Sequence, residues 1–142
     1  MGEDFDFSVR VNALKFQRKL GKGGFGEVHL CIDELTGDEV AVKHLSYESS
    51  NSTSQMVEKE VKALSALQHK HIVKLIGAFP KPHDQELLVV MEFLAGKELY
   101  DYWKRFKGRK MPEKEVAEIM LQLSQAIEFC HSKKVIHRDM KF

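Results

Sequence analysis

In the first third of the chain, apolar and polar residues alternate with a period of two, the pattern of β-strands. The segment 28–33 shows it most regularly, with valine, leucine and isoleucine at every second position. A strand is also expected over 14–20, before this segment, and over the β-branched segment 39–45 after it. Residues 34–38 have the composition of a hairpin turn, with Gly37 where a positive φ is expected.

Two more strands are expected in the middle of the chain. The mostly apolar segment 69–77 leads from the end of a helix into a strand, and the apolar segment 87–91 predicts a buried strand. Between them, residues 80–85 contain two prolines and predict a turn.

Three helices are predicted from apolar residues at helical spacing. The first covers 55–68, the second is a short aromatic helix over 98–106, and the third begins at Pro112 and ends near His131. One face of the third helix carries Val116, Ile119, Met120, Leu123, Ile127 and Cys130. Together these elements predict an α+β fold: an antiparallel sheet of about five strands with one helix, followed by a helical part.

Gly21, Gly23 and Gly26 form the pattern G-x-G-x-x-G between the first two predicted strands. Glycine has no Cβ and tolerates positive φ, so this segment can turn tightly and lie against a large anion. An ordinary glycine-rich hairpin turn is the alternative. A dinucleotide-binding loop would open a helix here, and a Walker-type loop needs Gly-Lys-Ser/Thr, which is absent. Because a strand follows, the pattern favours a flap that covers the phosphates of ATP.

Lys43 and Glu60 form a candidate buried ion pair. Glu60 lies at the edge of the apolar stripe of the helix 55–68, where a carboxylate is costly unless a cation meets it. Lys43, near the end of the strand 39–45, is the expected cation; a solvated Glu60 beside Lys62 is the alternative. A lysine held in this way can reach phosphate oxygens in a fixed geometry.

Composition narrows the classes of protein. With 43% hydrophobic residues, 30% charged residues and a formal net charge of +1, the chain resembles an ordinary globular domain without strong attraction to nucleic acids or membranes. Cys31 and Cys130 are expected to be reduced thiols, and His69 and His71 to be structural or solvent-facing rather than metal ligands. Without a transmembrane run or a signal peptide, an intracellular location is expected, in the cytoplasm with the nucleus left open.

The tripeptide His137-Arg138-Asp139 follows the glycine loop, the strand lysine and the helical glutamate in that order. From about Phe16 onward the sequence therefore resembles the protein kinase family. Lys141 is similar to a lysine that the serine/threonine class of this family has at this position. Tyrosine kinases usually have alanine at the same position. The subfamily is left open.

The resemblance implies ATP as the bound nucleotide and assigns roles to individual residues. It implies that Asp139 accepts the proton of the substrate hydroxyl, that Lys141 helps to neutralise the transferring phosphoryl group, and that Lys43, paired with Glu60, binds the α- and β-phosphates. The implied ATP-binding set is Leu20, Gly21, Lys22, Gly23, Gly24, Phe25, Gly26, Val28, Ala41, Lys43, Met91, Glu92, Leu94 and Glu98.

Within that set the resemblance separates the adenine pocket from the linker. Leu20 and Val28 match residues above and below the adenine, Ala41 matches the small residue that lines it, and Met91 matches the gatekeeper. Glu92 and Leu94 match linker positions whose backbone groups bind adenine, and Glu98 matches a residue near the ribose.

The sequence ends at Phe142, before the asparagine that the family pattern places at position 144 and before the Asp-Phe-Gly motif. Magnesium is expected for the family, but its ligands are absent from these residues, so no metal site is predicted here. The truncated chain is therefore expected to be nearly inactive by itself. The apolar face of the helix from Pro112 to His131 is expected to be exposed and to favour self-association.

The predicted organisation is an N-terminal extension, 1–13, and an incomplete protein kinase domain, 14–142. The latter divides into an ATP-binding small lobe, 14–94, and the first helices of the large lobe with the start of the catalytic loop, 95–142. The expected function is transfer of the γ-phosphate of ATP to serine or threonine hydroxyls of a protein substrate. The alternatives are a non-catalytic module that binds nucleotide or a partner, pseudokinase-like or a competing short form, and, more remotely, a nicotinamide-dependent oxidoreductase.

Overall fold

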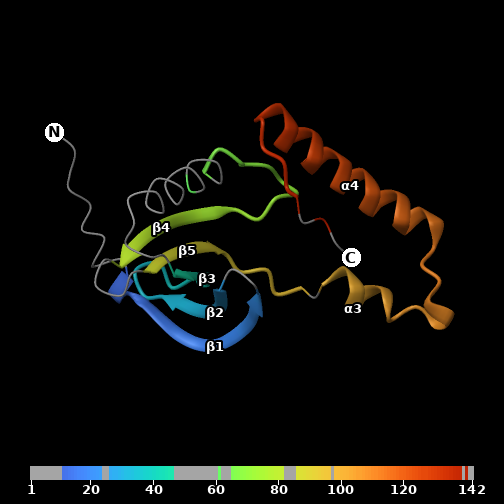
Figure 1. The fold of residues 1–142 in the computed structure, drawn as a ribbon. Helices are drawn as coiled ribbons and strands as arrows, with labels where there is room; N and C mark the ends of the chain where they lie inside the picture. Colours follow the sequence, from blue (N-terminus) through green and yellow to red (C-terminus); the bar gives the residue numbers. More distant parts are fainter. Residues whose placement is uncertain are drawn as a thin grey trace. The chain divides into compact units, whose positions relative to one another are not determined.

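The computed structural model describes residues 11–23, 26–46, 61, 65–81, 86–96, 98–138 and 140. These residues belong to two compact units (Figure 1). Unit 1 takes in Met1–Ser65 and Lys74–Phe93, and unit 2 takes in Ala66–Val73 and Leu94–Phe142.

Unit 1 contains a five-stranded antiparallel sheet in the order β1-β2-β3-β5-β4 (Figure 1). The strands are β1 (Leu14–Gly23), β2 (Gly26–Asp33), β3 (Glu39–Ser46), β4 (Leu75–Lys81) and β5 (Glu86–Glu92). The predicted α+β fold class is confirmed. The predicted helix over 55–68 lies largely outside the described residues, within which Val61 and Ser65 are helical.

The β2–β3 turn has the predicted hairpin geometry. Gly37 has a φ of +80°, and its N–H donates to the Asp33 carbonyl oxygen at 2.7 Å. The carboxylate of Asp33, a fully buried residue, accepts a hydrogen bond from the Leu35 N–H at 3.1 Å. The turn is therefore closed by the backbone and by one side chain of the strand that enters it.

The sheet has two faces with different roles. The main hydrophobic cluster lies on one face and consists of Cys31, Val40, Val42, Phe79, Leu88 and Val90, with Val11 and Leu14 packed against it. The register Val42↔Val90 brings two almost fully buried side chains of this cluster together on neighbouring strands. Because side chains alternate along a strand, the residues between the cluster members point to the opposite face.

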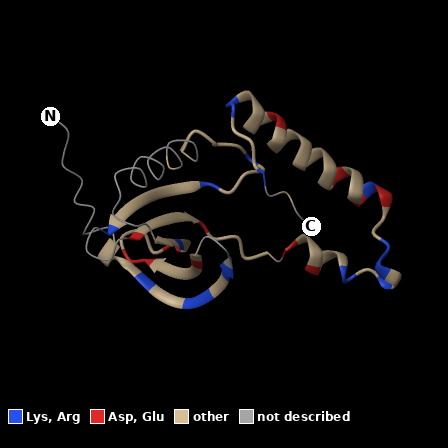
Figure 2. Cartoon of the chain, in the orientation of Figure 1, with Lys and Arg blue, Asp and Glu red and all other residues tan. Residues whose placement is uncertain are grey.

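Unit 2 contains α3 (Leu99–Trp103), the 3₁₀ turn η1 (Lys107–Arg109) and α4 (Glu113–Ser132). Pro112 is the N-cap of α4, close to the predicted start, because its fixed φ suits the first turn and it has no N–H to leave unsatisfied. The His69 ring stacks on Phe129 of α4 with centroids 5.1 Å apart. Lysine and arginine residues gather along the connection between α3 and α4 (Figure 2).

Three predicted boundaries are wrong. Residues 69–73 are turn and irregular structure rather than the start of a strand. Strand β4 continues through Pro80 and Lys81, which were predicted as a turn; an edge strand can accept proline because one side of it needs no ladder hydrogen bond. Helix α3 ends at Trp103 rather than at residue 106, since the N–H groups of Arg105 and Phe106 donate to carbonyl oxygens three residues back instead of four.

Candidate functional site

The glycine pattern forms the tip of the β1–β2 hairpin. Gly23 pairs with Gly26, Lys22 with Glu27, and Gly21 with Val28. The register shifts between Lys19 and Gly21, which places Leu20 at an irregularity of the strand. A strand and not a helix follows the glycines, as expected for a phosphate-covering flap, and this removes the structural basis of the nicotinamide alternative.

Two glycines of the pattern occupy different environments. Gly26 has a φ of +134°, and a Cβ at this position would lie 1.8 Å from the backbone oxygen of His44. Gly21 has no atom within 4 Å of the corresponding Cβ position. Glycine is therefore required at Gly26 by the close approach of β2 to β3, whereas the space beside Gly21 is open.

Four predicted site residues share one face of the sheet, opposite to the main hydrophobic cluster. Val28 stands directly across from Lys43, and Ala41 directly across from Met91. Ala41 is 9% exposed, and Lys43 is half-buried. An apolar strip beside a cation has the chemistry needed for a nucleotide, whose base is apolar and flat and whose phosphates are anionic.

Glu92 is fixed at the end of β5 by two hydrogen bonds to Lys74. Its N–H donates to the Lys74 carbonyl oxygen at 3.0 Å, and its carboxylate accepts from the Lys74 N–H at 2.7 Å. The N–H of Glu92 is thereby occupied, so the main-chain group that this residue can offer a base is its carbonyl oxygen.

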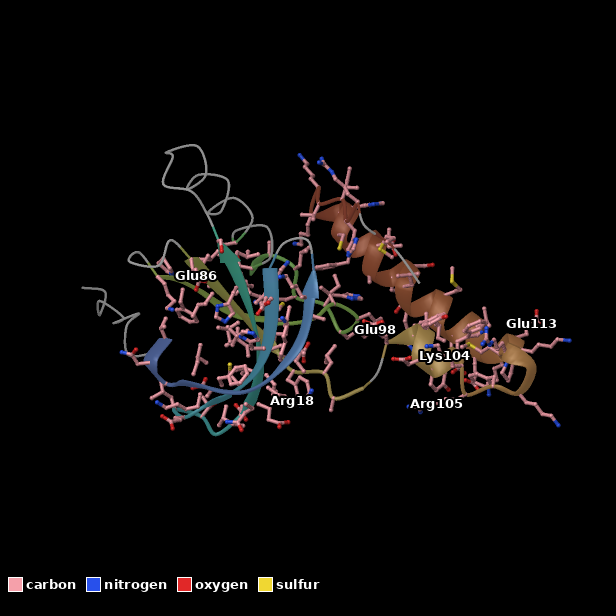
Figure 3. The ribbon with its side chains drawn as sticks, turned by 60° about the horizontal axis from the view of Figure 1, so that its bottom comes forward. Arg18, Glu86, Glu98, Lys104, Arg105 and Glu113 are labelled. Atoms are coloured by element: carbon pink, nitrogen blue, oxygen red, sulfur yellow. The ribbon has the colours of Figure 1, made fainter. Side chains whose placement is uncertain are left out.

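The predicted linker residue Leu94 and the predicted ribose-side residue Glu98 belong to unit 2. Leu94 is 57% exposed. Glu98 is the N-cap of α3, and its side chain is exposed and makes no capping hydrogen bond (Figure 3).

The predicted site is only partly described. Five of its members lie outside the described residues: Gly24, Phe25, Glu60, Asp139 and Lys141. The predicted pairing of Lys43 with Glu60 and the predicted catalytic roles therefore stay predictions.

The sequence analysis missed a chain of polar side chains that crosses β2, β3 and β5. His29 Nε2 lies 3.4 Å from Glu27 Oε2, His29 Nδ1 lies 3.2 Å from His44 Nε2, and His44 Nδ1 lies 3.4 Å from Glu86 Oε2. Figure 3 labels Glu86 at one end of this chain. The sequence gives only a weak signal for these contacts. The alternation of polar residues is visible in it, but the strand register that brings the four side chains together is not.

Glu27, at the first end of this chain, also binds the lysines of β1. Lys19 Nζ lies 2.6 Å from Glu27 Oε1 and Lys22 Nζ lies 3.9 Å from it. The hydrogen bond from Lys19 is the main cause that holds the pKa of the Glu27 carboxyl below its ordinary value. The flap hairpin is thus joined across its two strands by charge as well as by backbone hydrogen bonds.

Both cysteines are free, as predicted. Cys31 belongs to the main hydrophobic cluster, and burial raises the pKa of its thiol. Among the described residues, no cluster of histidine, cysteine, aspartate or glutamate side chains is arranged to hold a metal ion. No helix in the described part of the chain is both long and apolar enough to span a membrane.

Comparison with known proteins identifies the family. The protein kinase domain matches residues 14–142. The chain belongs to the protein kinase family. Among its relatives, it is 40% identical over 134 residues to a protein of Fusarium virguliforme named sucrose non-fermenting protein kinase 1. It is 39% identical over 134 residues to the carbon catabolite-derepressing protein kinases of Candida tropicalis and Candida albicans.

These matches cover 93% of this kinase chain but only 18–21% of the relatives. The chain thus spans about a fifth of the length of the curated relatives it matches. The prediction of a protein kinase domain is confirmed at the level of the family.

Proposed function

We propose that this protein kinase domain binds ATP on the sheet face that carries Lys43 and that the whole protein transfers the γ-phosphate to serine or threonine hydroxyls of protein substrates. The observation that carries the proposal is the strand register, which puts the apolar side chains of Val28, Ala41 and Met91 on the same face as the Lys43 ammonium. Strand β2, which carries Val28 on this face, is also one of the two strands of the flap hairpin β1–β2.

Each described residue has a proposed task. Val28, Ala41 and Met91 bind the apolar adenine, and Lys43 binds phosphate oxygens through its three ammonium donors. The Glu92 carbonyl oxygen accepts a hydrogen bond from the base. The glycines let the flap backbone approach the phosphates without a Cβ in the way.

The roles of Glu60, Asp139 and Lys141 rest on the family resemblance. Glu60 orients the lysine, Asp139 accepts the proton of the attacking hydroxyl, and Lys141 neutralises charge on the transferring group. Magnesium, when bound in a kinase, neutralises the phosphates, and the family holds it with the catalytic-loop asparagine and the Asp-Phe-Gly aspartate. Neither motif occurs in the 142 residues.

For the 142-residue polypeptide by itself, we therefore propose nucleotide binding without efficient phosphoryl transfer. A general base contributes about 10²–10⁴-fold, whereas phosphoryl transfer depends chiefly on positioning and on electrostatic stabilisation by the metal. In a polypeptide that has the catalytic aspartate but lacks the residues that bind magnesium, most of the activation free energy for phosphoryl transfer therefore remains.

Nucleotide binding is tested by titrating the chain with a fluorescent ATP analogue and displacing it with ATP or with NAD. We expect ATP, but not NAD, to displace the fluorescent analogue. We also expect the Lys43→Ala variant to lose binding of the analogue. Lys15→Ala is the matched control, because Lys15 is also a strand lysine but its side chain is exposed and pairs with Glu34 at 3.7 Å. Equal binding by both variants would disprove the role of Lys43.

Phosphoryl transfer is tested separately with radiolabelled ATP and a mixture of serine- and threonine-containing peptides. We expect no turnover by the 142 residues. Turnover that disappears in Asp139→Asn would contradict the proposed inactivity while supporting the role of Asp139. Binding and transfer are thus tested by independent measurements.

We also propose that the 142-residue polypeptide self-associates through the apolar face of α4. Val116 is 41% exposed and Met120 is 51% exposed, and Met120 lines an apolar groove of about 560 Å³ formed by side chains that include those of α3 and α4. Sedimentation velocity should show a concentration-dependent increase in mass that Met120→Lys reduces. Gln122→Lys, on the same helix but not at an apolar position, should leave it unchanged.

A further inference from the structure

The connection between α3 and α4 carries a dense group of cations. Five of the seven residues from 104 to 110 are basic and none is acidic: Lys104, Arg105, Lys107, Arg109 and Lys110. All five are exposed. Figure 2 shows their segments in blue at this connection, and Figure 3 labels Lys104 and Arg105. We call these five residues the basic surface.

The basic surface is held in a defined shape. The indole N–H of Trp103 donates to the Arg109 carbonyl oxygen at 2.9 Å. Gly108 and Arg109 have φ values of +64° and +54°, so the backbone reverses at this point. The Arg109 guanidinium lies 5.3 Å from the centroid of the Trp103 ring, and Lys104 Nζ lies 4.1 Å from that of Tyr100. Cations that are already positioned lose less conformational entropy when they bind a partner.

Few acidic side chains neutralise this surface within the described part of unit 2. Lys104 Nζ lies 3.3 Å from Asp101 Oδ1, and the other four cations form no ion pair with a described residue. Glu115, a nearby acidic residue of α4, accepts a hydrogen bond from the Tyr102 hydroxyl at 2.6 Å instead. Neighbouring like charges repel, and an anionic partner would relieve this repulsion.

The aromatic side chains beside the surface argue against nucleic acid as the partner. Tyr100 and Trp103 stack on each other with centroids 5.5 Å apart, and Tyr102 meets Phe106 edge to face at 5.4 Å. Lys104 and Arg109 lie over the rings of this first pair. Rings that are engaged with each other and with cations offer little face for the base stacking that single-stranded nucleic acids require.

A membrane is also a poor match. No large apolar side chain of the segment 104–110 is exposed, so nothing in it can enter the acyl region. With a formal net charge of only +1, the chain lacks the overall attraction to an anionic bilayer that would compensate for this.

We propose that the basic surface docks an acidic segment of a protein partner, with aspartate and glutamate carboxylates meeting the five cations. Arg105 and Arg109 can each bind a carboxylate through two parallel N–H groups, and the lysines add point charges around them. This docking uses unit 2 alone and does not depend on nucleotide binding.

The test measures binding of a fluorescein-labelled peptide of alternating aspartate and glutamate by fluorescence anisotropy. The chain is compared with the double variant Lys107→Glu/Lys110→Glu, which spares the loop contacts of Trp103 and Arg109. Lys15→Glu/Arg18→Glu is the matched control, since it makes the same change in net charge at exposed positions of β1. Circular dichroism checks that both variants keep the fold.

We expect the basic-surface variant to bind the peptide about tenfold more weakly and the control to bind within about twofold of the unchanged chain. Binding should weaken from low salt to physiological ionic strength. Equal losses in both variants, or no binding at low salt, would overturn the proposal. Tighter binding to a single-stranded oligothymidine or to phosphatidylserine vesicles than to the peptide would also overturn it.

Discussion

Replacing Gly26 with alanine should destabilise the sheet of unit 1 much more than replacing Gly21. At Gly26 the new Cβ would meet the His44 carbonyl oxygen at 1.8 Å, so β2 and β3 have to move apart or twist. A non-glycine residue in a sparsely populated backbone conformation costs about 1–3 kcal/mol, and overpacking adds about 1–3 kcal/mol. The free energy of unfolding should therefore fall by about 2–6 kcal/mol in Gly26→Ala.

Gly21→Ala is the internal control because it makes the same chemical change in the same glycine pattern. Its Cβ meets no atom within 4 Å. Alanine is favoured over glycine inside a strand by about 0.5–1 kcal/mol, so stability should stay within about 1 kcal/mol of the unchanged chain.

Urea unfolding followed by circular dichroism measures both variants under one condition. If the two substitutions cost the same, or if Gly26→Ala costs less than about 1 kcal/mol, the close approach of β2 to β3 at this point is not what requires glycine. A large loss at Gly21 would contradict the open space described beside it.

Three further outcomes follow from the burial and the charges of unit 1. Val90, 0% exposed, lies in the main hydrophobic cluster, so Val90→Ala should lower the free energy of unfolding by about 1.5–3 kcal/mol in urea; a loss below about 0.5 kcal/mol would contradict that packing. The lowered pKa of Glu27, caused mainly by the hydrogen bond from Lys19, contributes stability that is present above the ordinary value of 4.5 and is lost as the pH falls through the folded-state value. Acid unfolding curves should therefore fall less steeply for Glu27→Gln, and identical curves would argue against the contact. Iodoacetamide should modify Cys130 faster than Cys31, because Cys31 is buried and burial raises its pKa; urea should remove the difference, and equal rates in the native state would refute it.

Local patterns in the sequence predicted most elements of the fold. Alternation of apolar residues is sufficient to predict β2, β-branched residues predict β3, and a continuous apolar segment predicts β5, since each strand carries its own signal. Pro112 marks the start of α4 because proline is compatible with a first helical turn and not with a helix interior. The glycine pattern predicted a strand-turn-strand hairpin, because the residues after it alternate rather than repeat every three or four positions.

The features that could not be predicted depend on which segments become neighbours. The extension of β4 through Pro80 needs the knowledge that β4 is an edge strand. The early end of α3 goes with the contact between the Trp103 indole and the Arg109 carbonyl oxygen. The particular constraint on Gly26, unlike Gly21, comes from the backbone of the neighbouring strand β3. Sequence motifs gave the types of residue in the candidate site, and the strand register gave the face that four of them share.

The polar chain of Glu27, His29, His44 and Glu86 across β2, β3 and β5 is fully hydrogen-bonded only with a particular number of shared protons. Its three gaps, from Glu27 to His29, from His29 to His44 and from His44 to Glu86, each need one N–H to form a hydrogen bond. Two neutral imidazoles supply only two N–H groups, so one gap is left without a bond. Two imidazolium rings supply four, and two N–H groups then face each other between the rings. Only three shared protons complete the chain, so the three strands are joined most fully when the two rings together carry a single positive charge between two carboxylates.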